Sequence, residues 1–402
     1  MLDAYVYDGI RSPIGRHAGK LAPVRPDDLA GEMIAEVVKR NGVKPGDISD
    51  VILGCVTQAG EDCRNVARFA TLMAGLPPTV PGVTVNRLCA SGLQAVTDAA
   101  RAITAGEGDL YVAGGVESMS RAPYVMGKSE APYGRDVKLY DTTIGSRFTN
   151  PRFKKLYGDQ AMPETGDNVA REFGVSREQA DEFALASQKK YAKAEAEGFY
   201  KGEILEVKIP SKKRDAPPTI VAQDEHPRRD STMEMLAKLK PLYEGGVVTA
   251  GNASGVNDGA AALIIASRKW GENNGKKPIA RILSAASAAV EPRIMGVGPA
   301  YAIPKALERA GKALKDMDII EINEAFASQV LGCLKLMNVD FKDPRVNPNG
   351  GAIAIGHPLG CSGARLALTV SRQLQETGSK YAAVSLCIGV GQGLAVILER
   401  AA

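Results

Sequence analysis

One cysteine stands at a position that favours a reactive thiolate. Cys89 lies between an expected strand at residues 83–85 and an expected helix that begins near Ser91. The dipole at a helix N-terminus favours a thiolate, and the free N–H groups there can bind an oxyanion. Most single cysteines are instead inert and buried, so position alone leaves both interpretations open. Cys89 is therefore a candidate nucleophile.

A cysteine nucleophile needs a base, and the chain has three histidines. His357 lies in the glycine-rich loop 350–360, just before an expected helix. Loops of this kind carry functional groups on a rigid scaffold. His17 lies in an early polar loop and His226 in a charged region. His357 is therefore the best partner for Cys89, and a hydrogen-bonded loop histidine is the alternative.

A second cysteine near the C-terminus could support this pair. Cys387 follows an expected strand and precedes the glycine-rich segment 389–393, where Gly389 lets backbone N–H groups approach a substrate. A thiol there could transfer protons, although the position alone is more typical of a buried structural cysteine. The segment does not indicate a dinucleotide site, because residues 394–398 resemble a strand and not a helix.

Two polar residues at strand ends are ambiguous. Asn323 follows the expected strand 319–322, on the side of an α/β sheet that binds ligands. A turn or helix-capping asparagine is the alternative, and Glu117 allows the same two interpretations. Metal ligation is not expected, because seven residues separate Cys55 from Cys63 and no histidine lies near either.

Short apolar runs alternate with helix-length patterns along the chain. Residues 51–53 and 110–113 are typical of buried strands, and residues 29–39 and 92–104 of helices, which favours an α/β fold. The same order occurs twice, which predicts two duplicated halves. In the first half an expected helix at 30–39 precedes an expected strand at 50–53, and in the second a helix at 299–309 precedes a strand at 318–321. In each half, a Val-Asn pair is then followed by a Ser-Gly pair that begins a helix, within residues 85–92 and 346–363.

The middle of the chain differs from both halves. Residues 121–246 are rich in charge and proline, and they contain basic clusters at 212–214 and 228–229. Such clusters usually form a solvated face, and docking of phosphates is the alternative. We interpret the halves as residues 1–120 and 273–402, with an inserted loop domain at 121–246 and a return to the first half at 247–272.

Composition narrows the function classes. Hydrophobic residues make up 45% and charged residues 24%, as in globular proteins. The net charge of +4 does not indicate nucleic acid but suits an anionic small ligand, and 5% aromatics offer few platforms for base stacking. No apolar run approaches the ~20 residues that span a membrane. Six widely spaced cysteines and an N-terminus unlike a signal peptide predict a reducing, cytoplasmic setting.

Taken together, these residues resemble the thiolase family. Four segments are similar to its active-site motifs and a fifth to its coenzyme A loop: Cys89-Ala90-Ser91, Asn323-Glu324-Ala325-Phe326, Gly356-His357-Pro358, Cys387-Ile388-Gly389 and residues 252–259. The similarity extends over essentially the whole chain. Residues 58–68 and 118–128 most resemble the members that act on 3-oxoadipyl-CoA. Ala161 departs from the histidine typical of members specific for acetoacetyl-CoA.

The resemblance implies a five-layer αβαβα fold, a homotetramer or dimer, and coenzyme A as a substrate with no tightly bound cofactor. It implies these roles: Cys89 as the acyl-accepting nucleophile, His357 as its base, Cys387 as the acid and base, Asn323 on the water of a first oxyanion hole, the amides of Cys89 and Gly389 as a second hole, and Ser254, Arg228, Ala325, Phe326 and Met162 as the coenzyme A contacts.

The implied reaction is thiolysis of a 3-oxoacyl-CoA, expected to be 3-oxoadipyl-CoA, to acetyl-CoA and succinyl-CoA. Acetoacetyl-CoA and broad fatty 3-ketoacyl-CoA thiolases are the alternatives for the substrate. A decarboxylating condensing enzyme would carry a histidine or asparagine at Cys387, and a thiolase-like lipid carrier would lack one of the reactive residues. The end of a 3-oxoadipyl chain is a carboxylate, for which Arg64, Arg68 and Arg121 are candidates; surface ion pairs are their alternative.

Overall fold

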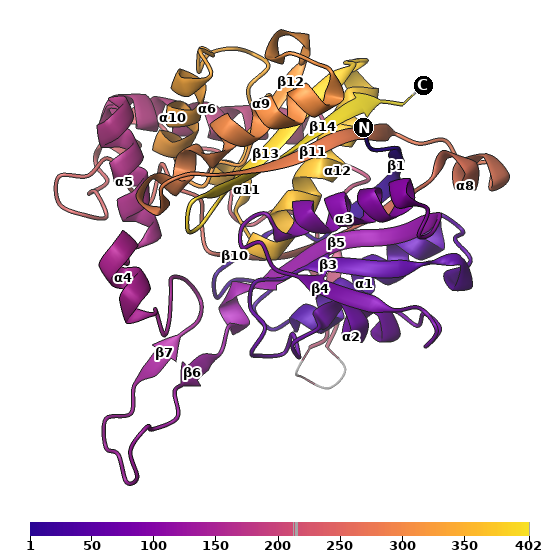
Figure 1. Ribbon diagram of the computed structural model, residues 1–402, viewed down its shortest axis with the longest axis horizontal. Coiled ribbons are helices and arrows are strands. Elements are labelled where there is room, and N and C mark those ends of the chain that lie inside the picture. The colour runs from indigo at the N-terminus through magenta and orange to yellow at the C-terminus, as the bar shows by residue number, and fades with distance from the viewer. Residues whose placement is uncertain (212, 214–215, 402) are drawn as a thin grey trace.

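The computed structural model describes residues 1–211, 213 and 216–401. Figure 1 shows two sheets stacked with helices above, between and below them. Helices α3 (Ser91–Ala105) and α12 (Leu359–Thr377) lie between the sheets, α9 (Gly298–Ala310) covers the outside of one sheet, and α1 (Pro26–Arg40) and α2 (Val66–Met73) cover the outside of the other. Separate apolar cores fill the spaces between these layers. The predicted five-layer αβαβα fold is therefore confirmed.

The remaining elements complete these layers and the middle segment. The strands are β1 (Ala4–Arg11), β2 (Gly15–Arg16), β3 (Asp50–Gly54), β4 (Gly82–Val85), β5 (Leu110–Ser118), β6 (Tyr124–Met126), β7 (Leu139–Asp141), β8 (Val207–Ile209), β9 (Thr219–Val221), β10 (Asn257–Ala266), β11 (Ala280–Ala289), β12 (Ile319–Ile322), β13 (Tyr381–Ile388) and β14 (Gln392–Arg400). The other α-helices are α4 (Pro151–Tyr157), α5 (Met162–Phe173), α6 (Arg177–Ala196), α7 (Met233–Ala237), α8 (Arg268–Asn273), α10 (Ala327–Leu336) and α11 (Ala352–Ile355).

Strand order repeats between the two halves, as the duplicated sequence pattern predicts. The first half has the strand order β4-β3-β5-β10-β1, with β2 paired to β10, and the second half has β12-β13-β14-β11. A short antiparallel pairing of β1 with β11 at Ala4–Val6 joins these two layers into one hydrogen-bonded sheet of ten strands. The pairs β3–β4, β3–β5 and β12–β13, toward the two ends of the strand order, are parallel, whereas β5–β10, β10–β1, β13–β14 and β14–β11 are antiparallel. Val346 forms an isolated parallel bridge to Ile320 of β12, at the place that β4 takes beside β3. The two halves therefore share one topology.

Glycines bring the two central helices into backbone contact. A Cβ atom on Gly92 of α3 would overlap backbone atoms of α12, and a Cβ on Gly363 of α12 would overlap the backbone of Leu93. Gly92 is the second residue of α3 and Gly363 the fifth residue of α12. The N-termini of α3 and α12 therefore meet, one from each half, and the loops that carry Cys89 and His357 meet with them.

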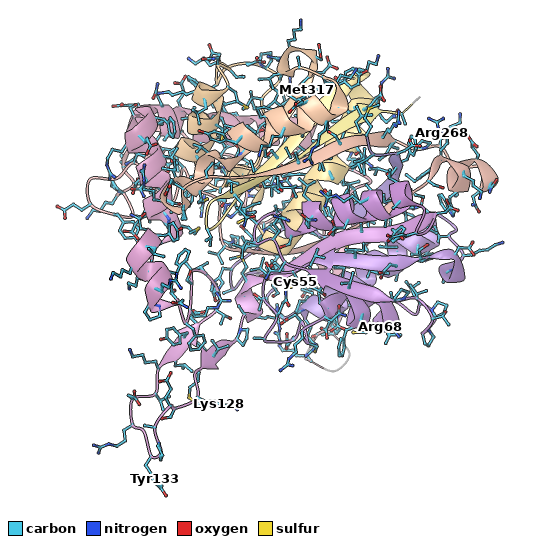
Figure 2. The ribbon with its side chains drawn as sticks, viewed as in Figure 1. Cys55, Arg68, Lys128, Tyr133, Arg268 and Met317 are labelled. Atoms are coloured by element: carbon cyan, nitrogen blue, oxygen red, sulfur yellow. The ribbon has the colours of Figure 1, made fainter. Side chains whose placement is uncertain are left out.

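The middle segment lies outside this layered body. The hairpin of β6 and β7 projects from the molecule, with Lys128 on the hairpin and Tyr133 near its tip (Figure 2). Helix α6 begins after Ser176, whose side chain accepts the N–H of Gln179 in a reciprocal capping box. Strand β10 returns to the first sheet between β1 and β5. None of the helices in the described ranges is both long and apolar enough to cross a bilayer.

Candidate active site

Cys89 lies on the loop between β4 and α3, one residue before the helix N-cap. Leu88 adopts a left-handed backbone with φ of 46° and leads directly into the cysteine. Burial raises the pKa of the Cys89 thiol to about 11, although the N–H groups of Gly389 and of Cys89 itself lower it. This shift is opposite in direction to the thiolate that the position at a helix end alone favours. Desolvation outweighs the helix dipole, so the thiol must lose its proton to a base.

His357 lies on the equivalent loop of the second half, two residues before α12 begins. Its backbone N–H donates to Asn257 Oδ1 at 2.8 Å, and its Nδ1 lies 2.6 Å from Ser362 Oγ. The Ser362 hydroxyl donates its single proton to the Pro358 carbonyl at 2.8 Å, so the same oxygen accepts from Nδ1–H. Nδ1 therefore carries the ring proton, and Nε2 is free to accept one.

The electrostatics of the His357 site favour a neutral imidazole. Burial, together with the nearby Arg365 guanidinium, lowers the pKa of His357 to about 3. Arg365 is buried on α12, and its Nη2 has no hydrogen-bond partner within the described part of the chain. His357 is thus an unprotonated base at neutral pH.

Asn323 follows β12 and faces the same imidazole. Its backbone N–H donates to the Ser385 carbonyl at 2.9 Å, which fixes it beside β13. Its Nδ2 lies 3.4 Å from His357 Nε2 and 3.5 Å from Nδ1. Its Oδ1 is buried and has no hydrogen-bond partner among the described residues. Because a buried carbonyl oxygen is costly to leave unpaired, this atom offers a place for a water molecule.

Cys387 is the penultimate residue of β13 and lies in an apolar environment. The cysteine is fully buried, and it belongs to a small cluster with Met162, Met295, Ala325 and Phe326. Burial and the nearby Cys89 thiol raise the pKa of Cys387 well above its ordinary value. Cys387 is thus a neutral thiol close to Cys89, able to donate a proton.

The loop that resembles a coenzyme A site packs against the same cluster. The Ser254 N–H donates to the Ala325 carbonyl at 2.9 Å, and Ala253 forms an isolated bridge with Phe326. Arg228 is exposed, and its backbone N–H donates to Gln188 Oε1 at 2.9 Å. Arg229 pairs with Glu195, as on a solvated face, whereas residues 212 and 214 of the other basic cluster lie outside the described residues.

Glu117, which the sequence left ambiguous, holds two loops of this site together, and the sequence does not identify two further residues that contact His357. Glu117 is buried, and its carboxylate accepts the N–H groups of Val56, Thr57 and Gly360 at 2.9–3.0 Å, which joins the loop after β3 to the start of α12. The contact of Ser362 with the His357 imidazole could have been predicted from their separation of five residues, across the start of the expected helix. Asn257 gave no such signal, because its partner is distant in sequence.

Two of the three arginines that are candidates for binding a substrate carboxylate have other partners in this chain, and the third is exposed. Arg121 forms a paired contact with Glu61, and Arg68 donates to the carbonyls of Pro78 and Val80. Arg64 is exposed in the loop before α2. Within the described ranges, no group of three histidine, cysteine, aspartate or glutamate side chains is arranged to bind a metal ion.

Comparison with known proteins gives the same family over both halves. Residues 4–269 match the family model for the thiolase N-terminal domain, and residues 276–400 match that for the thiolase C-terminal domain. The chain is 55% identical over 402 residues to a beta-ketoadipyl-CoA thiolase of Acinetobacter baylyi and to a 3-oxoadipyl-CoA/3-oxo-5,6-dehydrosuberyl-CoA thiolase of Escherichia coli, with each chain fully covered.

More distant relatives include an acetyl-CoA acetyltransferase of Cupriavidus necator, which is 42% identical with both chains fully covered. The crystal structure of the Bacillus anthracis acetyl-CoA acetyltransferase superposes with a TM-score of 0.91 at 39% identity, over 100% of this chain and 99% of the other. From the family models and the full-length relatives, the chain belongs to the thiolase family of acyltransferases.

Proposed function

We propose that this chain cleaves 3-oxoadipyl-CoA with coenzyme A, giving acetyl-CoA and succinyl-CoA. The observation that carries the proposal is the full-length identity of 55% to relatives named for this substrate, against 42% to an acetyl-CoA acetyltransferase. The alanine at position 161, where acetoacetyl-specific members typically carry histidine, supports the same substrate. Acetoacetyl-CoA and longer 3-ketoacyl-CoA remain the alternatives that the experiment below compares.

In the first half-reaction, the Cys89 sulfur attacks the C3 keto carbon of the substrate and His357 Nε2 takes the thiol proton. The C2–C3 bond then breaks, and its electron pair leaves on acetyl-CoA as an enolate. Cys387 gives its proton to C2, so free acetyl-CoA departs and the acyl group remains on Cys89 as a thioester. The buried, neutral state of Cys387 suits this proton donation.

In the second half-reaction, the Cys387 thiolate takes the proton of incoming coenzyme A. The coenzyme A sulfur attacks the acyl carbon, and Cys89 leaves as a thiolate that recovers its proton from His357. Protons and electrons balance over the cycle without a metal or redox cofactor. Two covalent steps through one acyl-enzyme imply ping-pong kinetics.

Two oxyanion sites stabilise the charges that form. A water molecule on Asn323 Oδ1, together with His357 Nε2, would bind the thioester oxygen of the acetyl-CoA enolate; the buried and unpaired Oδ1 within the described residues supports this role. The N–H groups of Cys89 and Gly389 would bind the oxygen of the acyl group on Cys89, and their approach to the Cys89 sulfur supports this role.

Coenzyme A would approach along the apolar cluster of Cys387. Ala325, Phe326 and Met162 supply an apolar wall, and the Ser254 loop lies against Ala325. Arg228 is exposed and could pair with a phosphate of the nucleotide end. The contact of Arg228 with a phosphate is the simplest of these to test, because an exposed ion pair weakens with salt and the KM for coenzyme A should then rise.

We also propose a homotetramer or dimer that acts in the cytoplasm. The projecting β6–β7 hairpin carries exposed apolar side chains, with Tyr133 100% and Leu139 65% exposed, and an isolated hairpin rarely keeps such side chains in water. Strand β4 ends its sheet with Val83 exposed, so its edge could pair with a second copy. Reactive thiols at Cys89 and Cys387 suit a reducing compartment.

Thiolysis measured side by side tests the substrate. We expect kcat/KM to be highest for 3-oxoadipyl-CoA, lower for acetoacetyl-CoA and lower for a longer 3-ketoacyl-CoA. A higher value for either alternative would overturn the proposed substrate and leave the family unaffected. Incubation with substrate but without coenzyme A, followed by peptide mass spectrometry, should place the acyl group on Cys89, whereas acyl label on Cys387 or Cys361 alone would overturn the nucleophile.

A further inference from the structure

The two N–H groups near the Cys89 sulfur come from different halves of the fold. One belongs to Cys89 itself at the start of α3, and the other to Gly389 in the turn between β13 and β14. A pair of donors stabilises an oxyanion well only when their separation is fixed before the charge forms. Some contact must therefore connect the nucleophile loop to the Gly389 turn.

The Gly389 turn is itself a strained segment. Val390, its middle residue, has φ of 65° and is exposed, so neither a special backbone preference nor burial favours this conformation. A β-branched residue in the left-handed region costs free energy, and such strain persists only where surrounding contacts determine it. The turn thus needs an external restraint to keep Gly389 in place.

Arg87, two residues before Cys89, supplies that restraint. Its Nη1 donates to Gln392 Oε1 at 3.0 Å, directly after the Gly389 turn, and its Nε donates to Gln94 Oε1 at 2.6 Å on α3. Gln94 in turn donates to Asp98 at 2.6 Å, one turn further along the helix. The guanidinium therefore connects the nucleophile helix of one half to the Gly389 turn of the other.

The backbone of Arg87 is restrained as well. Its N–H donates to Ser91 Oγ at 2.9 Å, and Ser91 donates to the Leu88 carbonyl at 2.6 Å. Arg87 therefore cannot move without disturbing the loop that carries the Cys89 amide. A guanidinium suits this position because its rigid fork reaches two acceptors at once, which the single ammonium of lysine does with less directional control.

We propose that Arg87 is a positioning residue that fixes the separation of the Cys89 and Gly389 N–H groups. The inference rests on the proposed acyl-enzyme at Cys89, because the two amides matter only if an oxyanion forms there. Arg87 acts through Gln392 and Gln94 and does not itself react. Its substitution should slow acyl transfer to and from Cys89 and leave coenzyme A binding unchanged.

The test compares Arg87→Met with Arg101→Met. Arg101 is half-exposed on α3 and donates to the same Asp98 oxygen that accepts from Gln94, so its variant removes a positive charge from the far end of this chain of contacts and leaves the connection from Arg87 to Gln392 in place. We expect Arg87→Met to lower kcat roughly 10- to 100-fold, somewhat less than loss of a whole oxyanion donor, with the KM for coenzyme A within about twofold. Arg101→Met should keep the wild-type kcat.

Two further variants separate positioning from folding. Gln392→Leu breaks the same contact from the other side, and the double variant with Arg87→Met should lose no more activity than either single variant, whereas independent structural effects would multiply. Arg87→Lys should recover part of kcat. Circular dichroism and thermal unfolding identify any variant that fails to fold.

The measurement uses whichever 3-oxoacyl-CoA the wild-type protein cleaves fastest, so the choice of substrate does not affect the result. Failure of the proposed function would appear as a wild-type protein without acyl label on Cys89. Failure of the Arg87 inference would appear in a labelled, active protein as equal kcat for the Arg87→Met and Arg101→Met variants, or as multiplicative losses in the double variant.

Discussion

Ser362 decides which nitrogen of His357 carries the proton, and Ser362→Ala tests that conclusion. The variant removes the acceptor 2.6 Å from Nδ1, in a site where His357 is 4% exposed. An unpaired buried N–H costs about 1–3 kcal/mol, so the ring should favour the tautomer protonated at Nε2. Only the minor tautomer could then accept the Cys89 proton.

That cost converts directly into a rate. At 1.36 kcal/mol per tenfold change, about 1–3 kcal/mol corresponds to a roughly 5- to 150-fold lower rate of Cys89 acylation. KM for coenzyme A should change little, because Ser362 is buried away from the exposed Arg228. Rapid mixing with substrate in the absence of coenzyme A measures the acylation step alone.

Ser371→Ala is the matched control. Ser371 is buried on the same helix and donates to the carbonyl four residues earlier at 2.7 Å, as Ser362 does at 2.8 Å, but it has no contact with an imidazole. Both variants lose the same kind of helix hydrogen bond, and only Ser362→Ala should lose acylation rate. Equal acylation rates in the two variants would refute the assignment of the tautomer.

Four further outcomes follow from the geometry. Cys387→Ser should still form the acyl-enzyme but lose rapid exchange of the α-protons of acetyl-CoA, because a hydroxyl is too weak an acid; wild-type exchange would assign the proton transfer to another group. Gly363→Ala should lower stability by several kcal/mol, since its Cβ would overlap the Leu93 backbone, whereas Gly46→Ala, with open space around it, should change the melting temperature little. The buried Glu321 has a pKa raised to about 8, so the folded chain binds more protons than the unfolded chain between about pH 4.5 and 8 and loses stability as pH rises through that range; urea unfolding at several pH values should show a flatter profile for Glu321→Gln. Burial lowers the pKa of His226 to about 4, so its contribution has the opposite sign, and stability lost as pH falls from 6.5 toward 4 should be smaller in His226→Gln; an unchanged acid limb would argue against it.

The fold was predictable because its signals are local and occur twice. Each half shows the same order of helices and strands, and the bridge from Val346 to Ile320 of β12 even occupies the place that β4 takes beside β3. The order of the motifs also placed Cys89 and His357 at equivalent loops. Their meeting depends on backbone contact between α3 and α12, which needs small residues such as Gly92 at the crossing.

The state of each reactive group was not predictable. The sequence shows that Cys89 precedes a helix, but the burial of its thiol depends on how the chain packs around the loop, and this burial raises its pKa although the Gly389 N–H of the other half lowers it. The tautomer of His357 depends on a single hydroxyl whose proton is already used by the Pro358 carbonyl. A contact that depends on three residues at once produces no repeating pattern from which a sequence could predict it.

The two halves contribute unequally to the chemistry, and this has a consequence for protein synthesis. Cys89 belongs to the first half, whereas His357, just before the last helix, and Cys387, in β13, belong to the second. A growing chain on the ribosome therefore exposes its nucleophile long before it holds a base or proton donor. Until the C-terminal strands have folded against α3, the nascent thiol is an ordinary weak acid, and an incomplete chain does not consume the acyl-CoA pool around it.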